Sequence, residues 1–383
     1  MPRIHPKDFL RARAIDKAVH SLLPVCRDLA SARNELRWLQ DHAVHLSQRL
    51  GHADQQGLLA GFVSRRARGE PLQYILGSEF VGDLEIKCRP GVLIPRQETA
   101  ASVSHLARLL SIQRDKWEQK IKPVRVLDLC TGTGCIPLLF HHEFYQNEAH
   151  GDVPLELVGV DISPQALSLS RENLLHQIAD RSRSKQRGHL STRSLQSIAF
   201  VQADILKDEN WSNEPPSMPE ALRRLSGDDD DDDEENAELP TFDILISNPP
   251  YISPKCFKTT TRRSVRDYEP KTALVPQHSR TSSQSDEAIG DTFYPRLLQI
   301  ANLVKAKILL LEVSNMDQAR RAASVAINAR EWASVEIWRD DPAHDQAVTE
   351  ETGLAGTAVR VRGSGHGRSV FAYKAEANDW LKG

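Results

Sequence analysis

Residues Val126–Ile136 read VLDLCTGTGCI, and this stretch decides the fold. Its apolar first half predicts a buried strand, its two glycines predict a tight turn, and Cys135-Ile136 predicts the start of a helix. Glycines let the backbone pass close to a ligand, and a helix N-terminus presents unpaired N–H groups. The stretch is therefore suited to bind a nucleotide or a carboxylate, although such a turn can also serve only to connect a strand to a helix.

Apolar runs that alternate with helical segments surround this unit. Because strands and helices alternate at this spacing, we expect an α/β fold with a mostly parallel sheet covered on both faces. The seven expected strands are Val124–Leu129, Leu155–Val160, Ile198–Gln202, Phe242–Ser247, Ala306–Val313, Ser334–Trp338 and Ser369–Tyr373.

The N-terminal part of the chain instead shows the hydrophobic pattern of amphipathic helices. Leu36, Leu39, Ala43, Leu46 and Leu50 recur at helical spacing, and similar patterns cover residues 8–23 and 54–68. We therefore expect a helical domain over residues 1–70, a linker hairpin over 71–98 and the α/β domain over 99–383.

Three stretches of the α/β part are too polar to build a core. Residues 179–197 are rich in Arg and Ser, residues 208–240 contain an unbroken acidic run from Asp228 to Glu235, and residues 276–291 form a third polar segment. We expect all three to be disordered surface insertions, because such compositions bury little apolar surface.

Composition sets broad limits on the function. The net charge of -3 and the 26% of charged residues do not require a nucleic-acid partner, and the five cysteines form no C-x-x-C pair, which favours a reducing compartment. No run is long and apolar enough for a membrane helix, and the N-terminus lacks a secretory signal. Arg3, Lys7 and Arg11 could belong to an organellar presequence, but Asp8 and Asp16 favour an ordinary first helix.

Acidic residues lie at or near the ends of the first three strands of the α/β part. Asp161 ends the second strand, where a carboxylate can hold the ribose hydroxyls of an adenosine. Asp204 follows the third strand and could accept from an adenine amino group, or could cap a helix. Asp128, together with only two glycines, argues against an NAD site, and the arrangement resembles the S-adenosylmethionine site of class I methyltransferases. The candidate cofactor-binding residues are Asp128, Thr131, Gly132, Gly134, Asp161, Asp204 and Asn248.

The sequence Asn248-Pro249-Pro250-Tyr251 follows the fourth strand. An amide NH2 group is a poor nucleophile, so catalysis must orient it and favour a pyramidal nitrogen in the transition state. The Asn248 side-chain oxygen and the Pro249 carbonyl can each accept one N–H bond, Pro250 stiffens the backbone, and Tyr251 can stack on a planar acceptor. These four residues are the candidate catalytic group, and their chemistry requires no metal. A merely rigid loop is the alternative.

With these motifs in place, the chain resembles the HemK/PrmC family of protein-(glutamine-N5) methyltransferases, which modify the Gly-Gly-Gln glutamine of peptide chain release factors. The resemblance extends over nearly the whole chain. Besides Asp128–Ile136 and Asn248–Tyr251, it rests on Gly69–Gly77, Leu93–Thr99, Asp267–Pro270 with Ala273-Leu274, Leu311–Val313 and Gly367–Phe371.

The resemblance implies a protein substrate. It implies that the helical domain helps to hold a release factor, that Asn248 and Pro249 bind the glutamine amide, and that Arg96 lies near the active site as a substrate-binding residue. From the residues alone, Arg96 could equally pair with Glu98 or Glu70 on the surface. Gln97 and Ala100 depart from the family pattern, Cys130 stands where glycine is common, and the insertions suggest a eukaryotic member. The resemblance implies that a member with the helical domain is of the mitochondrial type, with a cytoplasmic location as the alternative.

Two other functions remain open at this stage. A nucleic-acid methyltransferase acting on adenine or guanine would offer the same planar NH2 group to Asn248 and Tyr251, but it would need a basic groove and a place for a flipped base. A non-catalytic binding subunit with the same fold is the second alternative, against which the intact motif residues argue.

Overall fold

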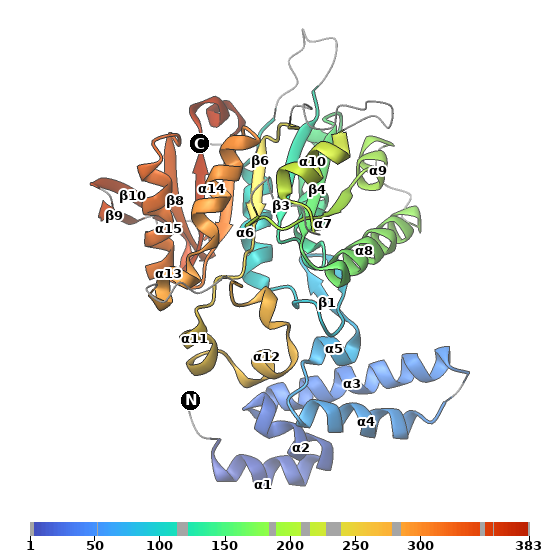
Figure 1. Cartoon of the computed structure of the whole chain (residues 1–383). Coiled ribbons are helices and arrows are strands. Elements are labelled where there is room, and N and C mark those ends of the chain that lie inside the picture. The colour runs from blue at the N-terminus through green and yellow to red at the C-terminus, as the bar shows by residue number, and fades with distance from the viewer. Residues whose placement is uncertain are drawn as a thin grey trace.

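A computed structural model describes residues 4–51, 53–112, 122–183, 189–207, 215–226, 239–277, 285–344, 349–354 and 356–381 of the 383-residue chain. Figure 1 shows a group of N-terminal helices below a larger body built on a twisted sheet, with a short connecting segment between them. In the described part of the chain, no helix has the length and apolar character needed to cross a membrane.

Four helices form the N-terminal part, and these are α1 (Pro6–Ile15), α2 (Lys17–Cys26), α3 (Leu29–Arg49) and α4 (Gln55–Ala67). The expected helical pattern over residues 8–23 is divided because Asp16 leaves the helical conformation and its side chain caps α2 through the Ala18 N–H. Leu36, Leu39 and Ala43 lie in a separate apolar core, whereas Leu50, at the C-terminal end of α3, is exposed.

The connecting segment contains α5 (Leu72–Leu76) and the hairpin of β1 (Ser78–Val81) and β2 (Leu84–Lys87), and α6 (Gln97–Leu109) follows. The Tyr74 hydroxyl donates to the carbonyl of Val92 at 2.7 Å, which holds the loop before α6 against α5.

The large sheet has the strand order β5-β4-β3-β6-β7-β11-β8-β10-β9. The first five of these strands are mutually parallel, and β11 is antiparallel to both of its neighbours. The strands are β3 (Val124–Leu129), β4 (Leu155–Asp161), β5 (Ala199–Gln202), β6 (Ile244–Ser247), β7 (Ile308–Glu312), β8 (Ser334–Asp341), β9 (Thr349–Leu354), β10 (Thr357–Arg362) and β11 (Ser364–Tyr373).

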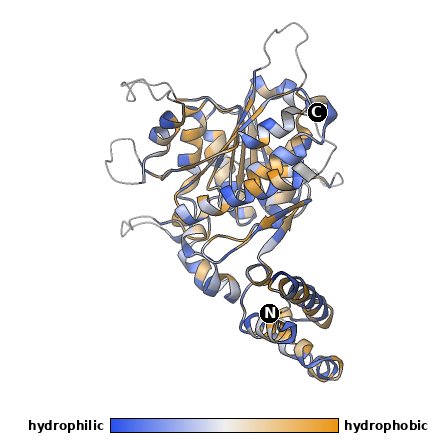
Figure 2. Cartoon of the chain, turned by 90° about the vertical axis from the view of Figure 1, so that its right-hand side faces the viewer, coloured by the Kyte–Doolittle hydropathy of each residue, from blue (hydrophilic) through white to orange (hydrophobic). Residues whose placement is uncertain are grey.

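Successive residues of the central strands pack on opposite faces of the sheet. Ile244 and Ile246 belong to one core and Leu245 to the other, and Leu310 and Leu309 are divided in the same way. Because both faces are buried, these strands are apolar throughout instead of alternating with polar residues. Figure 2 shows this apolar colouring on the inner strands and on neighbouring helices.

Helices cover both faces. Residues of α6, α7 (Cys135–Phe144) and α8 (Pro164–Arg183) pack in one core, and residues of α10 (Met218–Ser226), α14 (Phe293–Leu303) and α15 (Met316–Asn328) pack in the other. The expected fold class, a doubly covered α/β sheet of the class I methyltransferase type, is confirmed. The shorter elements are η1 (Glu148–His150), α9 (His189–Gln196), α11 (Pro254–Thr259), α12 (Arg263–Tyr268), η3 (Lys271–Ala273), α13 (Asp286–Gly290) and η4 (Ala375–Trp380).

The structure differs from the sequence expectation at the insertions and at one edge of the sheet. Residues 179–183 continue α8, and residues 189–196 form α9, whose Leu195 is buried in a core. Residues 218–226 form α10, whose Met218 and Leu222 are fully buried, and residues 286–290 form α13. Disorder was therefore wrongly expected for these residues, because a few apolar side chains at helical spacing suffice to anchor a polar helix. The acidic run from Asp228 to Glu235 lies outside the described residues.

The sheet also has two strands beyond the seven expected. Strands β9 and β10 extend it beside β8, with β10 parallel to β8 and β9 antiparallel to β10. Their sequence is rich in charged residues and Thr, so it lacks the apolar run that marks the inner strands.

Candidate functional site

The turn after β3 lies at the carboxyl edge of the sheet, where the tips of β4 and β6 flank it. Cys130, Gly132 and Gly134 have φ angles of 64°, 57° and 76°, so the backbone turns through three left-handed residues before α7 begins. A Cβ atom on Gly132 would meet no atom within 4 Å, whereas one on Gly134 would approach Ser170 and Phe200 closely. Gly132 therefore borders open space, and Gly134 is required for packing.

Asp128 is fully buried directly before this turn. Neither of its carboxylate oxygens meets a donor at hydrogen-bonding geometry among the described residues. Burial raises the pKa of this carboxyl well above its usual value, and the nearby Thr131 hydroxyl lowers it only in part. A buried acceptor without a protein partner is costly unless a ligand satisfies it.

Asp161 ends β4 and supports the turn from the side. Its two carboxylate oxygens accept from the backbone N–H groups of Gly132 at 2.8 Å and Ser163 at 2.9 Å. Burial raises the pKa of this carboxyl, and those backbone bonds oppose the rise. Each oxygen retains a second lone pair, so the residue is able to accept from a ligand hydroxyl.

Asp204 follows β5 at the same edge. Its side chain accepts from the N–H of Leu206 at 3.0 Å and forms a local turn, and no helix begins in the described residues 205–207. The helix-cap alternative is therefore not realised there. Asp128 lies near the end of β3, Asp161 ends β4 and Asp204 follows β5, and these strands are adjacent, so the fold brings together three of the cofactor residues predicted from the sequence.

Asn248-Pro249-Pro250-Tyr251 begins where β6 separates from β3. The buried Ser247 hydroxyl donates to the Leu129 carbonyl at 2.8 Å and joins the two strand tips. Asn248 follows at once, and its Nδ2 atom donates to Thr99 Oγ1 at 3.2 Å. The Asn248 amide oxygen therefore faces away from Thr99, and Asn248 lines a large cavity.

Tyr251 is held at both ends. Its hydroxyl donates to Glu312 Oε1 at 3.0 Å, and its backbone carbonyl accepts from Gln318 Nε2 at 3.1 Å. Burial raises the pKa of the Glu312 carboxyl, and burial together with Glu312 raises the pKa of the Tyr251 hydroxyl. The tyrosine is therefore a fixed neutral donor at the wall of the cavity.

Arg96 has neither of the partners proposed from the sequence. Its guanidinium pairs with the buried carboxylate of Glu269 at 2.8 Å, and that carboxylate also accepts from the Ile94 N–H at 3.1 Å. Glu70 instead pairs with Arg65 at 2.6 Å. The surface alternatives with Glu98 and Glu70 were therefore wrong, because the 173 positions between Arg96 and Glu269 are bridged only by the fold.

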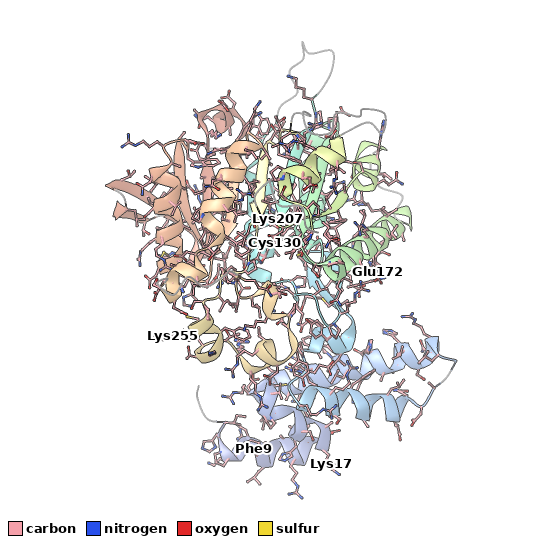
Figure 3. All side chains as sticks on the ribbon, viewed as in Figure 1. Phe9, Lys17, Cys130, Glu172, Lys207 and Lys255 are labelled. Atoms are coloured by element: carbon pink, nitrogen blue, oxygen red, sulfur yellow. The ribbon has the colours of Figure 1, made fainter. Side chains whose placement is uncertain are left out.

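The cavity beside this motif has a volume of about 830 Å³. Arg96, Asn248, Pro249 and Tyr251 lie on one side of it, and residues of α11, α12, α13 and α15 complete the wall. In Figure 3, Cys130 lies near the centre of the molecule and Lys255 lies on the outer side, on α11. The cavity extends from α11, which carries Lys255, to Asn248 at the carboxyl end of β6.

Sequence reasoning assigned no role to Thr99, Glu312, Glu269 or Gln318. Thr99, Glu269 and Glu312 lie in segments that carry the family resemblance, which was the available signal. Gln318 is a buried polar residue outside those segments, and its importance depends on partners far away in the sequence.

An acidic strand-tip site beside an Asn-Pro-Pro-Tyr loop, at the carboxyl edge of a mostly parallel sheet, defines a methyltransferase of the class I type. A family model described as Eco57I restriction-modification methylase matches residues 156–307. Among solved structures, a human methyltransferase 10 domain containing protein aligns with a TM-score of 0.38 and 11% identity, covering 76% of this chain and 88% of that chain.

Curated relatives are more specific. A probable MRF1 mitochondrial N(5)-glutamine methyltransferase of Schizosaccharomyces pombe is 30% identical, over 85% of this chain and 90% of that protein. The mitochondrial MRF1 N(5)-glutamine methyltransferase of Saccharomyces cerevisiae is 31% identical, over 72% and 68%. A release factor glutamine methyltransferase of Haemophilus influenzae is 28% identical, over 74% and 76%. The chain belongs to the family of N(5)-glutamine methyltransferases, and it is an enzyme.

Proposed function

We propose that this enzyme transfers the methyl group of S-adenosylmethionine to the side-chain amide nitrogen of the glutamine in a Gly-Gly-Gln motif of a peptide chain release factor. The observation that carries the proposal is the orientation of Asn248, whose amide oxygen faces away from Thr99 beside the turn of β3. An oxygen placed there accepts an N–H bond from an incoming amide.

The residues of the turn fit the cofactor. Among the described residues, Asp128 is a buried acceptor without a protein partner and Gly132 leaves open space, and Asp161 has lone pairs for ribose hydroxyls. We assign Thr131, Gly134 and Asp204 to the same site. When bound, S-adenosylmethionine supplies an electrophilic methyl group on a positively charged sulfur.

The chain orients the acceptor. Asn248 and the Pro249 carbonyl each accept one N–H bond of the glutamine amide, which aims the nitrogen lone pair at the methyl carbon. Pro250 stiffens the loop, and the Tyr251 ring forms the wall against which the planar amide stacks. Bound S-adenosylmethionine would supply the methyl group for the new nitrogen–carbon bond and would keep the electron pair of the broken sulfur–carbon bond, and the amide would lose one proton to solvent.

The charge of the cavity favours a protein loop over a nucleic acid. Five basic and four acidic side chains line it, so their charges nearly cancel. Three of the basic residues already pair with carboxylates, namely Arg96 with Glu269, Arg321 with Asp291 and Arg368 with Asp340. A groove for phosphates needs an excess of positive charge, whereas a glycine-rich loop does not.

We further propose that three segments of the chain have different roles. Residues 1–70 hold the release factor, 71–98 form the linker, and 99–383 carry out the transfer, with Arg96 lining the substrate cavity. The separate core of α1–α4 supports this division. The two mitochondrial relatives support a mitochondrial location, which subcellular fractionation of the full-length protein tests.

The test of the function is methyl transfer from labelled S-adenosylmethionine. A release-factor fragment with Gly-Gly-Gln is compared with the same fragment carrying glutamate in place of glutamine, and with RNA and DNA. We expect one methyl group on the glutamine by mass spectrometry and none on the glutamate fragment. Labelling of nucleic acid alone would overturn the proposal.

A further inference from the structure

Thr99 is a buried hydroxyl in the first turn of α6, with only 6% of its surface exposed. It lies 149 positions from Asn248 in the sequence, yet its Oγ1 atom is the partner of the Asn248 amide nitrogen at 3.2 Å. Neither the predicted catalytic group nor the predicted cofactor site includes it. The same Oγ1 atom also contacts a second buried polar group.

That second group is Glu312, at the carboxyl end of β7. Thr99 Oγ1 donates to Glu312 Oε2 at 2.5 Å, and the Tyr251 hydroxyl donates to Glu312 Oε1 at 3.0 Å. Only 5% of the Glu312 surface is exposed. One carboxylate thus holds both ends of the Asn248–Tyr251 loop, one directly and the other through Thr99.

The direction of these bonds determines how the Asn248 amide is turned. A hydroxyl has one hydrogen to donate. Because that hydrogen is committed to Glu312, Thr99 is left with lone pairs only, so it can accept from the Asn248 NH2 group but cannot donate to the Asn248 oxygen. The amide must then present its oxygen on the opposite side. A bond to a carboxylate is stronger than one between neutral groups, which favours this direction.

We propose that Thr99 and Glu312 are positioning residues that lock the Asn248 amide with its oxygen toward the acceptor, and that this lock makes the enzyme select an amide over a carboxylate. This inference rests on the proposed function. A glutamine side chain offers N–H donors to an oxygen, whereas a glutamate side chain at neutral pH offers only acceptors. The locked orientation therefore accepts glutamine and repels glutamate.

The test compares Thr99→Val with Thr99→Ser. Valine has nearly the shape of threonine but neither accepts from Asn248 nor donates to Glu312, and serine retains the hydroxyl. The matched control is Ser102→Ala on the same helix, where a buried hydroxyl contacts Ser369 Oγ at 2.9 Å instead of Asn248 or Glu312. Thermal melting of all three variants shows whether the fold is kept.

We expect Thr99→Val to lower kcat for the Gly-Gly-Gln fragment about tenfold, with the affinity for S-adenosylmethionine unchanged. Thr99→Ser and Ser102→Ala should stay near wild-type activity. Inhibition by the Gly-Gly-Glu fragment distinguishes the lock from simple packing. Inhibition should become stronger in Thr99→Val, because the freed Asn248 can turn its NH2 group toward the carboxylate of this fragment. A packing defect would instead weaken the binding of both fragments to the same extent.

If kcat is unchanged in Thr99→Val, or if the binding of both fragments is weakened equally, the inferred lock on Asn248 is overturned while the proposed function stays intact. If the wild-type enzyme does not methylate the glutamine fragment, the proposed function fails instead. The lock is then tested without substrate, through nuclear Overhauser contacts between the Asn248 side-chain NH2 and the Thr99 methyl group. These contacts should be present in the wild type, and their absence would also overturn the inference.

Discussion

The loops that follow β3 and β6 lie side by side at one edge of the sheet, yet they hold their shape in different ways. The β3 loop does so with its own backbone, through left-handed angles at Cys130, Gly132 and Gly134. The β6 loop is rigid because of two prolines and because side chains from α6, β7 and α15 hold Asn248 and Tyr251.

The buried carboxylates show the same contrast. Asp128 before the β3 loop has no hydrogen-bond partner among the described residues, whereas Glu312 beside the β6 loop accepts at both oxygens. An unsatisfied acceptor is what a binding site for a donor-bearing ligand requires, and a satisfied one is a fixed support. The comparison supports our proposal that the β3 side binds the cofactor and that the β6 side orients the acceptor amide.

The largest expected effect is that of Asn248→Ala on the orienting side. Because the amide oxygen is lost at the point where the acceptor must be aimed, we expect kcat to fall at least about 100-fold. Cofactor affinity should change little, since the β3 loop is untouched. Single-turnover transfer and cofactor titration measure the two effects separately. Unchanged turnover would mean that Asn248 does not contact the acceptor amide.

Asp161→Ala addresses the binding side. This substitution removes the acceptor proposed for the ribose and the bond to the Gly132 N–H, so we expect cofactor affinity to fall about tenfold. Turnover at saturating cofactor should be nearly kept. The control is Asp152→Ala, an exposed aspartate before the other end of β4. If Asp161→Ala lowered turnover without weakening cofactor binding, the two loops would not be functionally distinct.

Asp128→Asn should raise stability while weakening cofactor binding. Burial raises the pKa of this carboxyl in the folded protein. Below the pKa of the unfolded state the carboxyl is protonated in both states, so it costs no stability. As pH rises toward the folded-state pKa, ionisation increasingly favours the unfolded state, and this stability is lost. Removing the charge should therefore raise the melting temperature by roughly 2 to 4 °C at neutral pH. The gain should disappear toward about pH 4. A gain independent of pH would contradict an ionisation cost at Asp128.

The smallest expected effect concerns Cys130, a non-glycine residue with a φ angle of 64°. Glycine adopts this conformation without a steric cost, so Cys130→Gly should stabilise the fold by about 0.5–1 kcal/mol, measured by urea unfolding. Lys305→Gly, at a φ angle of 58° outside the site, is the matched comparison. A gain at Lys305 without one at Cys130 would show that packing of the thiol offsets the backbone strain.

Several features could be predicted from local sequence. The strand, turn and helix around Asp128 follow from an apolar run, two glycines and a second apolar run, and the seven inner and flanking strands follow from the same kind of pattern. Strands β9 and β10 escaped detection because they lie at the outer end of the sheet, with β9 at the edge and β10 beside it, where a strand needs no long apolar run. Helices α9 and α10 were missed because a few buried residues hold them.

The sequence by itself determined the class of fold, the residues at the strand tips and the kind of reaction. These depend on short-range patterns, namely hydrophobic period, turn-forming glycines and a stiff Asn-Pro-Pro-Tyr loop. Only the tertiary structure decided how Asn248 is turned and which carboxylate Arg96 contacts, because Thr99 and Glu269 lie 149 and 173 positions from their partners. Hydrogen bonds act over about 3 Å, so these partners become defined only when the sheet edge brings them together.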